Sequence, residues 1–196
     1  MLLRDQRSGA QQKNYIVSRD LVYADDTMLI SSDRSSVQTH VALIAEAGKA
    51  YGLELNLKKT VLLTVGAQAE NHIDGPDGKT IQCKDQATYL GGLLSCDGRP
   101  AGEVSRRLGE AGRLFEGISA IWKHANIPRH RKHEVFEACV VSKLLYGLES
   151  LWLLQADRTK LDGFYAKCLR RIYGIQPAYV SRVSNETVLK TAGVQQ

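Results

Sequence analysis

The sequence predicts an α+β protein in which an antiparallel sheet with a helix is followed by an all-helical bundle. In the first half, short apolar runs of strand length alternate with turn residues, and one segment has helical spacing. After residue 102, apolar residues recur every three or four positions over long stretches, as they do in packed helices. We therefore expect a polar N-terminal segment without a clear pattern at residues 1–20, a sheet domain at 21–97 and a helical domain at 103–196.

The sheet domain begins with two apolar runs, residues 21–23 and 28–30, which have the length and composition of strands. Asp25 and Asp26 lie between them, at the tight turn of the expected β-hairpin. Both carboxylates would then project from one edge of the sheet.

The rest of the sheet domain contains one helix and several strand candidates. Asp33 is a suitable N-cap for a helix that Gly52 would stop. Residues 61–65 and 80–83 have the apolar composition of strands, and so does the run 89–94. Adjacent glycines in this last run predict a bulge, or a position where a ligand approaches the backbone closely.

Three helices are expected after residue 102. The first has an apolar stripe made of Val104, Leu108, Ala111, Phe115, Ile118 and Trp122. The second begins near Pro128, and its apolar set contains Val135, Cys139, Val140, Leu144 and Leu145. The third is capped by Asp157, ends at Gly174 and carries Leu161, Phe164, Tyr165, Cys168, Leu169, Ile172 and Tyr173 at helical spacing. The polar faces of the first and third helices carry many Arg and Lys residues.

Composition limits the class of protein. The chain has 196 residues, 43% of them hydrophobic and 24% charged, which is ordinary for a globular protein and excludes a disordered chain. The net charge of +5 suits a polyanionic partner. The four cysteines are widely spaced and predict neither a disulfide framework nor a zinc site. The first twenty residues are too polar for a signal peptide, and no apolar run is long enough to span a membrane. We expect a soluble intracellular protein.

The adjacent Asp25 and Asp26 have two explanations. Neighbouring carboxylates repel each other, and a hard cation such as Mg²⁺ relieves that repulsion. Aspartate is also common in ordinary turns, so an acidic hairpin turn without a metal explains the pair equally well. The tetrapeptide alone leaves both explanations open.

Several segments resemble, in the same order, parts of the reverse transcriptases of non-LTR (LINE-type) retrotransposons. Tyr23-Ala24-Asp25-Asp26 resembles the active-site motif of that family, and residues 52–60 resemble the block that follows it. Residues 89–98 resemble its primer-grip hairpin, and residues 146–152 and 168–174 resemble segments of its thumb. The likeness extends from about residue 21 to 194 and implies a partial palm followed by a helical thumb.

The resemblance implies RNA-directed DNA synthesis on an RNA template and a DNA primer, with dNTPs as substrates. In the family's two-Mg²⁺ site, Asp25 matches a metal ligand, and Asp26 matches its neighbour, which has a secondary metal-binding or positioning role. Lys59, with Lys58 as the alternative, matches a lysine that protonates the leaving pyrophosphate or steadies its charge. The primer end would be held by Tyr89, Leu90, Gly91 and Gly92. The nucleic-acid backbone would be contacted by Arg106, Arg107, Arg113, Lys167, Arg170 and Arg171.

One departure from the family bears on activity. A complete enzyme of this type needs a further metal-binding Asp on a strand well upstream, and only twenty-two residues precede Tyr23. Asp5 and Asp20 do not lie in a suitable strand. We therefore expect the isolated chain to be an inactive, truncated polymerase with an exposed sheet edge. The alternatives are a non-catalytic remnant that binds nucleic acid through its basic helices, and a relic without a function.

Other candidate residues have simpler explanations. His130 and His133 are three positions apart, a spacing that occurs in metal sites, but the basic residues around them favour a basic turn that is solvated or faces a phosphate. Trp122 and Trp152 are expected to be core or inter-helix anchors rather than platforms for base stacking. Asp97 is expected to be a hairpin turn residue.

Overall fold

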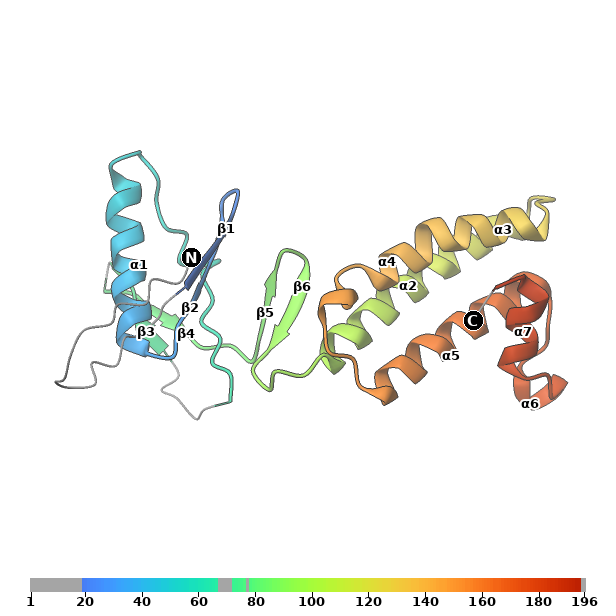
Figure 1. Ribbon diagram of the computed structural model, residues 1–196. Helices are drawn as coiled ribbons and strands as arrows, with labels where there is room; N and C mark the ends of the chain where they lie inside the picture. The colour runs from blue at the N-terminus through green and yellow to red at the C-terminus, as the bar shows by residue number, and fades with distance from the viewer. Residues whose placement is uncertain (1–18, 67–71, 77, 195–196) are drawn as a thin grey trace, which may run out of the picture. The chain divides into compact units, whose positions relative to one another are not determined.

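The computed structural model describes residues 19–66, 72–76 and 78–194, and the statements below refer to these residues (Figure 1). Contacts divide the chain into two compact units, Met1–Asp85 and Gln86–Gln196. Both contain helices and strands, which confirms the coarse α+β class. Of the polar segment expected at residues 1–20, all but Arg19 and Asp20 lies outside the described residues.

The first unit contains the predicted hairpin and helix. Strand β1 (Arg19–Tyr23) pairs antiparallel with β2 (Asp26–Ile30), and helix α1 (Arg34–Lys49) follows. The Asp33 carboxylate accepts a hydrogen bond from the Ser36 backbone N–H at 2.8 Å, so the predicted N-cap is confirmed. A second pair, β3 (His72–Asp74) and β4 (Thr80–Gln82), completes the unit.

The core of the first unit is small. Val41 of α1 packs with Ile73 of β3 and Ile81 of β4, and Leu29 of β2 lies against this cluster. On the β1–β2 hairpin, Leu21 remains 49% exposed and Val22 65% exposed. Because so few of its apolar side chains are buried, this hairpin is held to its unit mainly through β2.

The strand predicted at residues 61–65 is wrong. Only Leu62 forms an isolated parallel bridge, with Cys83, and the Lys84 N–H donates to the Leu62 carbonyl at 2.9 Å. Strand β4 is three residues long and ends at Gln82, so the chain offers too short a partner for a longer ladder. Within the described residues, the strands form three separate two-stranded sheets rather than the larger antiparallel sheet that the sequence suggested.

The second unit starts with a hairpin of β5 (Gln86–Tyr89) and β6 (Gly92–Ser95), followed by helices. These are α2 (Ala101–Trp122), α3 (Arg129–Val135), the π-helical segment η1 (Phe136–Val141), α4 (Ser142–Leu145), the 3₁₀ turn η2 (Leu148–Ser150), α5 (Gln155–Tyr173), α6 (Ala178–Ser181) and α7 (Asn185–Ala192). The β5–β6 hairpin therefore belongs to the same compact unit as these helices. The assignment of palm and thumb stays a prediction.

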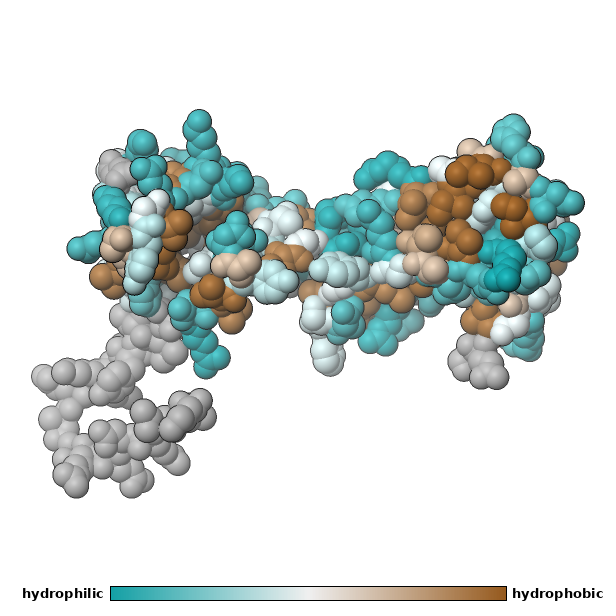
Figure 2. Space-filling view, turned by 90° about the horizontal axis from the view of Figure 1, so that it is seen from above, coloured by the Kyte–Doolittle hydropathy of each residue, from teal (hydrophilic) through white to brown (hydrophobic). Residues whose placement is uncertain are grey.

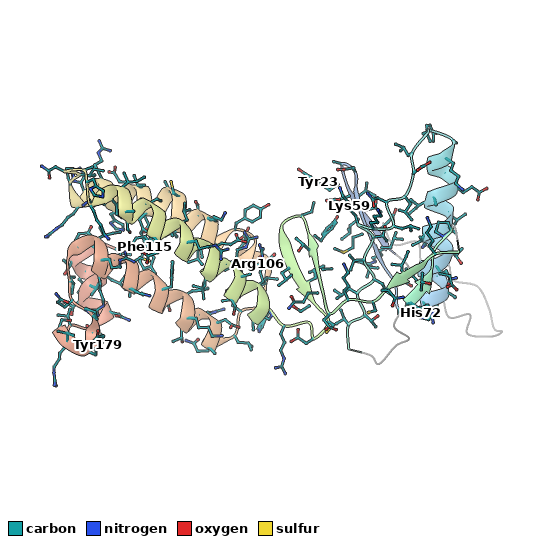
Figure 3. All side chains as sticks on the ribbon, turned by 180° about the vertical axis from the view of Figure 1, so that it is seen from behind. Tyr23, Lys59, His72, Arg106, Phe115 and Tyr179 are labelled. Carbon is teal, nitrogen blue, oxygen red and sulfur yellow. The ribbon has the colours of Figure 1, made fainter. Side chains whose placement is uncertain are left out.

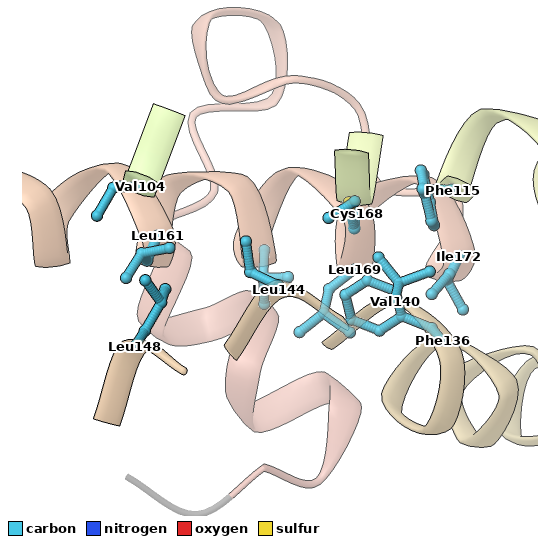
Figure 4. Close-up of a cluster of buried hydrophobic side chains, with 12 residues drawn as sticks. Val104, Phe115, Phe136, Val140, Leu144, Leu148, Leu161, Cys168, Leu169 and Ile172 are labelled. Carbon is cyan, nitrogen blue, oxygen red and sulfur yellow. The ribbon is translucent and has the colours of Figure 1, made fainter. Parts of the chain in front are cut away.

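Helices α2 and α5 and the continuous helical stretch from α3 to α4 enclose one apolar core (Figure 4). Phe136 is fully buried, with ring centroids 5.6 Å from Phe115 and 5.5 Å from Tyr165. Val104, Ala111 and Phe115 are buried, which confirms the stripe predicted for the first helix. Aromatic pairs at these distances add to the free energy gained from burial.

The apolar set predicted for the second helix is partly wrong. Val135, Cys139 and Leu145 are exposed, whereas the buried side chains are Phe136, Val140, Leu144 and Leu148. The π-helical segment η1 explains the difference, because its wider turn changes the residue spacing that returns to one face. Figure 2 shows hydrophobic residues gathered on the visible face of the helical unit, whose exposed apolar side chains include Ile121, Val135 and Leu145.

Two further expectations about the helices need correction. Helix α5 begins at Gln155, so Asp157 lies inside the first turn, where it is buried and pairs with Lys160 at 3.4 Å, instead of capping the helix. Trp152 is 88% exposed and anchors no core, because it follows the 3₁₀ turn η2 in a loop. Trp122 does pack on Phe115, at 6.0 Å between ring centroids. Gly174 ends α5 in the left-handed conformation, as predicted.

Candidate active site

The acidic pair lies at the tip of the β1–β2 hairpin. Tyr23 pairs with Asp26, so the loop consists of Ala24 and Asp25 alone. Ala24 has a φ of +52°, a left-handed conformation that costs a residue with a side chain about 1–2 kcal/mol. Asp25 and Asp26 are both exposed, and no hydrogen bond or ion pair joins either carboxylate to another described residue. Strained backbone at an accessible charged tip is typical of functional sites.

The chemistry of the two carboxylates suits Mg²⁺. This ion keeps several waters and is usually held by one or two carboxylates together with the phosphates of a substrate. Asp25 and Asp26 supply two hard oxygen donors without competing partners among the described residues. Over the same residues, no group of three or more His, Cys, Asp or Glu side chains gathers into a metal site. The pair therefore fits a metal that a bound substrate helps to hold.

Lys59 lies in the same unit as the acidic pair, in the loop after α1 (Figure 3). Residues 57–59 form a turn in which the Lys59 N–H donates to the Asn56 carbonyl at 3.0 Å and to the Asn56 side-chain oxygen at 3.3 Å. Lys58 and Lys59 are both exposed, so both ammonium groups are open to a polyanion. The structure leaves the choice between the two lysines open.

The predicted primer-binding residues lie at the tip of the β5–β6 hairpin. Tyr89 pairs with Gly92, and Leu90 and Gly91 form the loop. The apolar run 89–94 is thus not one bulged strand but the turn and second strand of a hairpin. Leu90 (φ +47°) and Gly91 (φ +78°) are both left-handed, the arrangement that a two-residue type I′ turn requires. For a residue as bulky as leucine this conformation is strained.

Two of the arginines predicted to contact nucleic acid are buried, so their expected place on an exposed face is wrong. Arg107 is 5% exposed and donates to Glu103 at 2.6 Å. Arg170 is 6% exposed and donates to the carbonyls of Gln176 and Val183 at 3.1 and 2.7 Å. Both guanidinium groups are held inside the helical unit because main-chain carbonyls there supply the acceptors.

The other basic residues of that set are more accessible. Arg113 and Lys167 are exposed, and Arg106 is partly exposed, at 30% of its side chain. Arg171 pairs with Glu116, and this hydrogen bond lowers the pKa of the Glu116 carboxyl. Its guanidinium also lies 4.9 Å from the centroid of the Phe115 ring.

A cavity of about 250 Å³ opens beside this arginine. It is lined by Phe115, Ser119, Trp122, Lys123, Lys132, Arg171 and Ile172. Three cationic side chains around aromatic rings form a surface that suits a phosphate with an attached ring. Trp122 and Phe115 therefore lie at a basic face as well as in the core.

His133 has partners of its own. Its ring nitrogens lie 3.1 Å from the Tyr173 hydroxyl and 3.2 Å from the Glu137 carboxylate. Glu137 also accepts a hydrogen bond from the Tyr165 hydroxyl at 2.6 Å. The ring is thus partly buried in a polar network, rather than on the solvated turn that the sequence favoured.

Sequence reasoning missed Glu103 and Tyr146. Glu103 is 3% exposed and contacts both Arg106 and Arg107. Their spacing of three and four residues on one helix is a recognisable signal for ion pairs. The Tyr146 ring covers the Arg107 guanidinium at 4.9 Å from its centroid, a contact without a local sequence signal because the two residues lie far apart in the chain.

A comparison with family models bears on these two hairpins. Residues 5–94 match reverse transcriptase (RNA-dependent DNA polymerase). The matched segment contains the acidic hairpin, helix α1, Lys59 and both strands of the β5–β6 hairpin up to Leu94. Searches of curated proteins and of solved structures gave no match. In the described part of the chain, no helix combines the length and the apolar character that crossing a membrane requires.

Proposed function

We propose that this chain is part of an RNA-directed DNA polymerase of the non-LTR retrotransposon type. The observation that carries the proposal is the position of Asp25 and Asp26 at an exposed hairpin tip within the reverse transcriptase match. The non-LTR type is supported by the likeness of residues 146–152 and 168–174 to thumb segments of that class.

In this proposal, Asp25 and Asp26 hold the Mg²⁺ that the polymerase reaction requires. When bound, the ion supplies Lewis-acid stabilisation of the oxygens that exchange at the transferred phosphate. The two carboxylates would hold the ion through their oxygens together with the phosphates of a bound dNTP. Lys59, with Lys58 as the alternative, attracts the charge of the leaving pyrophosphate.

The helical unit binds the template–primer duplex through its accessible cations. Arg113, Lys167 and the basic cavity at Lys123, Lys132 and Arg171 replace the buried Arg107 and Arg170 in this role. Contacts of this kind neutralise phosphates and release counterions, so the affinity falls as salt rises and depends little on sequence. The hairpin tip at Tyr89, Leu90, Gly91 and Gly92 receives the primer end.

Metal binding tests the first half of the proposal directly. Mn²⁺, a paramagnetic substitute for Mg²⁺, is titrated into the labelled chain with a primer–template and a dNTP, and amide signals are followed by NMR. We expect broadening centred on Asp25 and Asp26, which the Asp25→Asn, Asp26→Asn double variant abolishes. Broadening that persists in the double variant, or that centres elsewhere, would contradict the proposal.

Polymerase activity is a separate question. Among the described residues only two carboxylates gather at this tip, so the reacting atoms of primer and dNTP would be poorly fixed, and loss of positioning costs many orders of magnitude in rate. We expect no primer extension by the 196-residue chain on an RNA template with Mg²⁺ or Mn²⁺. Extension that Asp25→Asn abolishes would show that the chain is a complete catalyst. Salt-sensitive primer–template binding without the Mn²⁺ effect would favour a non-catalytic nucleic-acid binder.

A further inference from the structure

We propose that Glu103, Arg106, Arg107 and Tyr146 are positioning residues that fix the shape of the β5–β6 tip for a nucleic-acid strand. This inference rests on the proposed function, because it assigns the tip to primer binding. It gives two arginines that were expected to bind phosphates a different task. They act through the hairpin and not on the nucleic acid itself.

The tip is bound through its backbone. The Gly91 carbonyl accepts hydrogen bonds from Arg106 and from Arg107, both at 2.7 Å. Two residues further on, the Leu93 N–H donates to the Glu103 carboxylate at 3.1 Å. Side chains of α2 therefore hold the turn by its carbonyl and the following strand by its amide.

The three α2 side chains also hold one another. Glu103 accepts from Arg106 at 2.7 and 2.8 Å, through both carboxylate oxygens, and from the Arg107 Nε at 2.6 Å. Arg106 makes a further pair with Glu110 at 2.8 Å. Burial by itself raises the pKa of the Glu103 carboxyl, but the hydrogen bonds from the two arginines outweigh it and the pKa lies below its usual value. The carboxylate stays charged and its geometry is fixed.

Close packing adds to these bonds. A Cβ placed on Gly91 would lie 3.6 Å from the Tyr146 ring, so the ring covers the turn as well as the Arg107 guanidinium. A Cβ on Gly102 of α2 would lie 3.4–3.5 Å from Ser95, Gln86 and Leu93. The N-terminal end of α2 thus lies directly against one face of the hairpin, and Tyr146 covers its tip. Figure 3 labels Arg106 on this helix.

The clamp formed by Glu103, Arg106, Arg107 and Tyr146 leaves Leu90 at the tip and Leu94 on the opposite face exposed to a ligand, while Ala87 and Tyr89 on that face are half-buried. Residues that pair across strands share a face, so Ala87, Tyr89, Gly92 and Leu94 lie on the side away from Gln86, Leu93 and Ser95. Leu90 at the tip is 42% exposed and Leu94 is 37% exposed. An apolar face with a glycine suits the sugar and base edges of a strand end, which approach the backbone closely.

Charge supports the indirect role of the arginines. Each of the two arginines is paired with a carboxylate, Arg106 with Glu103 and Glu110 and Arg107 with Glu103, so neither guanidinium is without an anionic partner. A phosphate would have to compete with buried carboxylate and carbonyl partners for the Arg107 guanidinium. The strained φ of +47° at Leu90 is the feature that such a clamp would maintain.

The test uses the 196-residue chain with Arg107→Lys and Arg106→Gln, and Glu186→Gln as the matched control. Lysine keeps the charge but lacks the planar fork that reaches two acceptors. Arg106 is partly exposed, so we expect the fold to tolerate its replacement by glutamine. Glu186 pairs with Lys190 at 2.7 Å on the surface, far along the chain from the hairpin. Retained tryptophan fluorescence verifies folding, since Trp122 packs on Phe115 in the core of the helical unit.

Two quantities are measured. Amide hydrogen exchange of residues 92–95 reports the hairpin, and anisotropy of a fluorescein-labelled DNA primer on an RNA template reports affinity over a salt series. In both variants we expect exchange about tenfold faster and affinity about tenfold weaker. The slope of log affinity against log salt should equal that of the wild type, because no phosphate contact is lost. Glu186→Gln should change none of these quantities.

Each of the following outcomes would overturn one part of the proposal. Faster exchange with unchanged affinity would overturn positioning, and unchanged exchange would overturn the clamp itself. A reduced salt slope in Arg106→Gln would show that this arginine contacts phosphate directly. If the wild-type chain binds no primer–template at low salt, the proposed function fails. If the wild type binds and both variants keep its affinity and its exchange rates, only the positioning role fails.

Discussion

The two hairpins at the candidate sites have the same loop length but are supported differently. Each has a two-residue loop after a tyrosine, and each loop begins with a non-glycine residue in the left-handed region, Ala24 in one and Leu90 in the other. The tip at Leu90 is bound by two arginines and covered by a tyrosine ring. The Asp25–Asp26 tip has no such support among the described residues. A hairpin tip that binds through its shape needs other residues of the protein to fix that shape. Carboxylates that are to bind a metal ion must instead keep their oxygens free of protein partners.

The largest effect is expected when one residue of the clamp, Arg107, is removed. Arg107→Ala should lower the free energy of unfolding of the helical unit by about 1.5–3 kcal/mol, because it removes a charge-assisted hydrogen bond to the buried Glu103 carboxylate. Urea denaturation followed by tryptophan fluorescence measures the change. The exposed Arg113→Ala is the control, with an expected change of less than about 0.5 kcal/mol. Equal midpoints for the two variants would contradict the clamp.

Acid is expected to weaken the β5–β6 hairpin but not the β1–β2 hairpin. The pKa of Glu103 is lowered in the folded chain from its usual 4.5, so the unfolded chain binds more protons below that pH. The stabilisation is complete above about pH 4.5 and is lost as the pH falls through the lower folded value. Arg106, Arg107, Glu110 and Lys143 are the charged groups around this site.

Hydrogen exchange at pH 3 to 6 reports this loss, and Glu103→Gln serves as the comparison. We expect protection of residues 92–95 to fall with acid in the wild type and to be lower and nearly constant in the variant. Protection of β1 and β2 should not follow the same curve. A wild-type profile that matches the Glu103→Gln profile would show that the carboxylate does not hold the hairpin.

A smaller effect is expected from glycine at the unsupported tip. Ala24→Gly removes a left-handed strain of about 1–2 kcal/mol but adds about 0.5–1 kcal/mol of backbone entropy to the unfolded chain. The net result is a gain of about 0.5–1 kcal/mol for β1–β2, measured as slower amide exchange there. Leu90→Gly should gain less, because part of the leucine side chain is buried. A loss of protection in Ala24→Gly would mean that the φ of +52° is not strained.

The smallest effect is expected at the acidic pair. The Asp25→Asn, Asp26→Asn double variant should change the free energy of unfolding by less than about 0.5 kcal/mol, because neither carboxylate has a partner among the described residues. Amide exchange of β1 and β2 measures it. A clear stabilisation by Asn would indicate mutual repulsion of the two charges, and a clear loss would indicate a structural role for them.

The sequence predicted the features that local chemistry determines. The apolar runs beside Asp25 and Asp26, the Asp33 cap and the Gly174 terminus are short-range signals, and each is found in the structure. The sequence could not predict which arginines would be buried, because Arg107 and Arg170 are held by carbonyls of Gly91 and Val183, which tertiary structure brings to them. Residues 61–65 failed as a strand for a related reason, since a strand needs a partner that the local sequence does not specify.

The π-helical segment Phe136–Val141 has a consequence for how the hairpin clamp could be lost. Deleting one residue there would restore regular α-helical spacing and rotate the following residues by about 100° around the helix axis. Leu144 would leave the core, and the Tyr146 ring would turn away from Arg107. We therefore expect a one-codon deletion in this segment to uncover the tip without changing any residue of the β5–β6 hairpin.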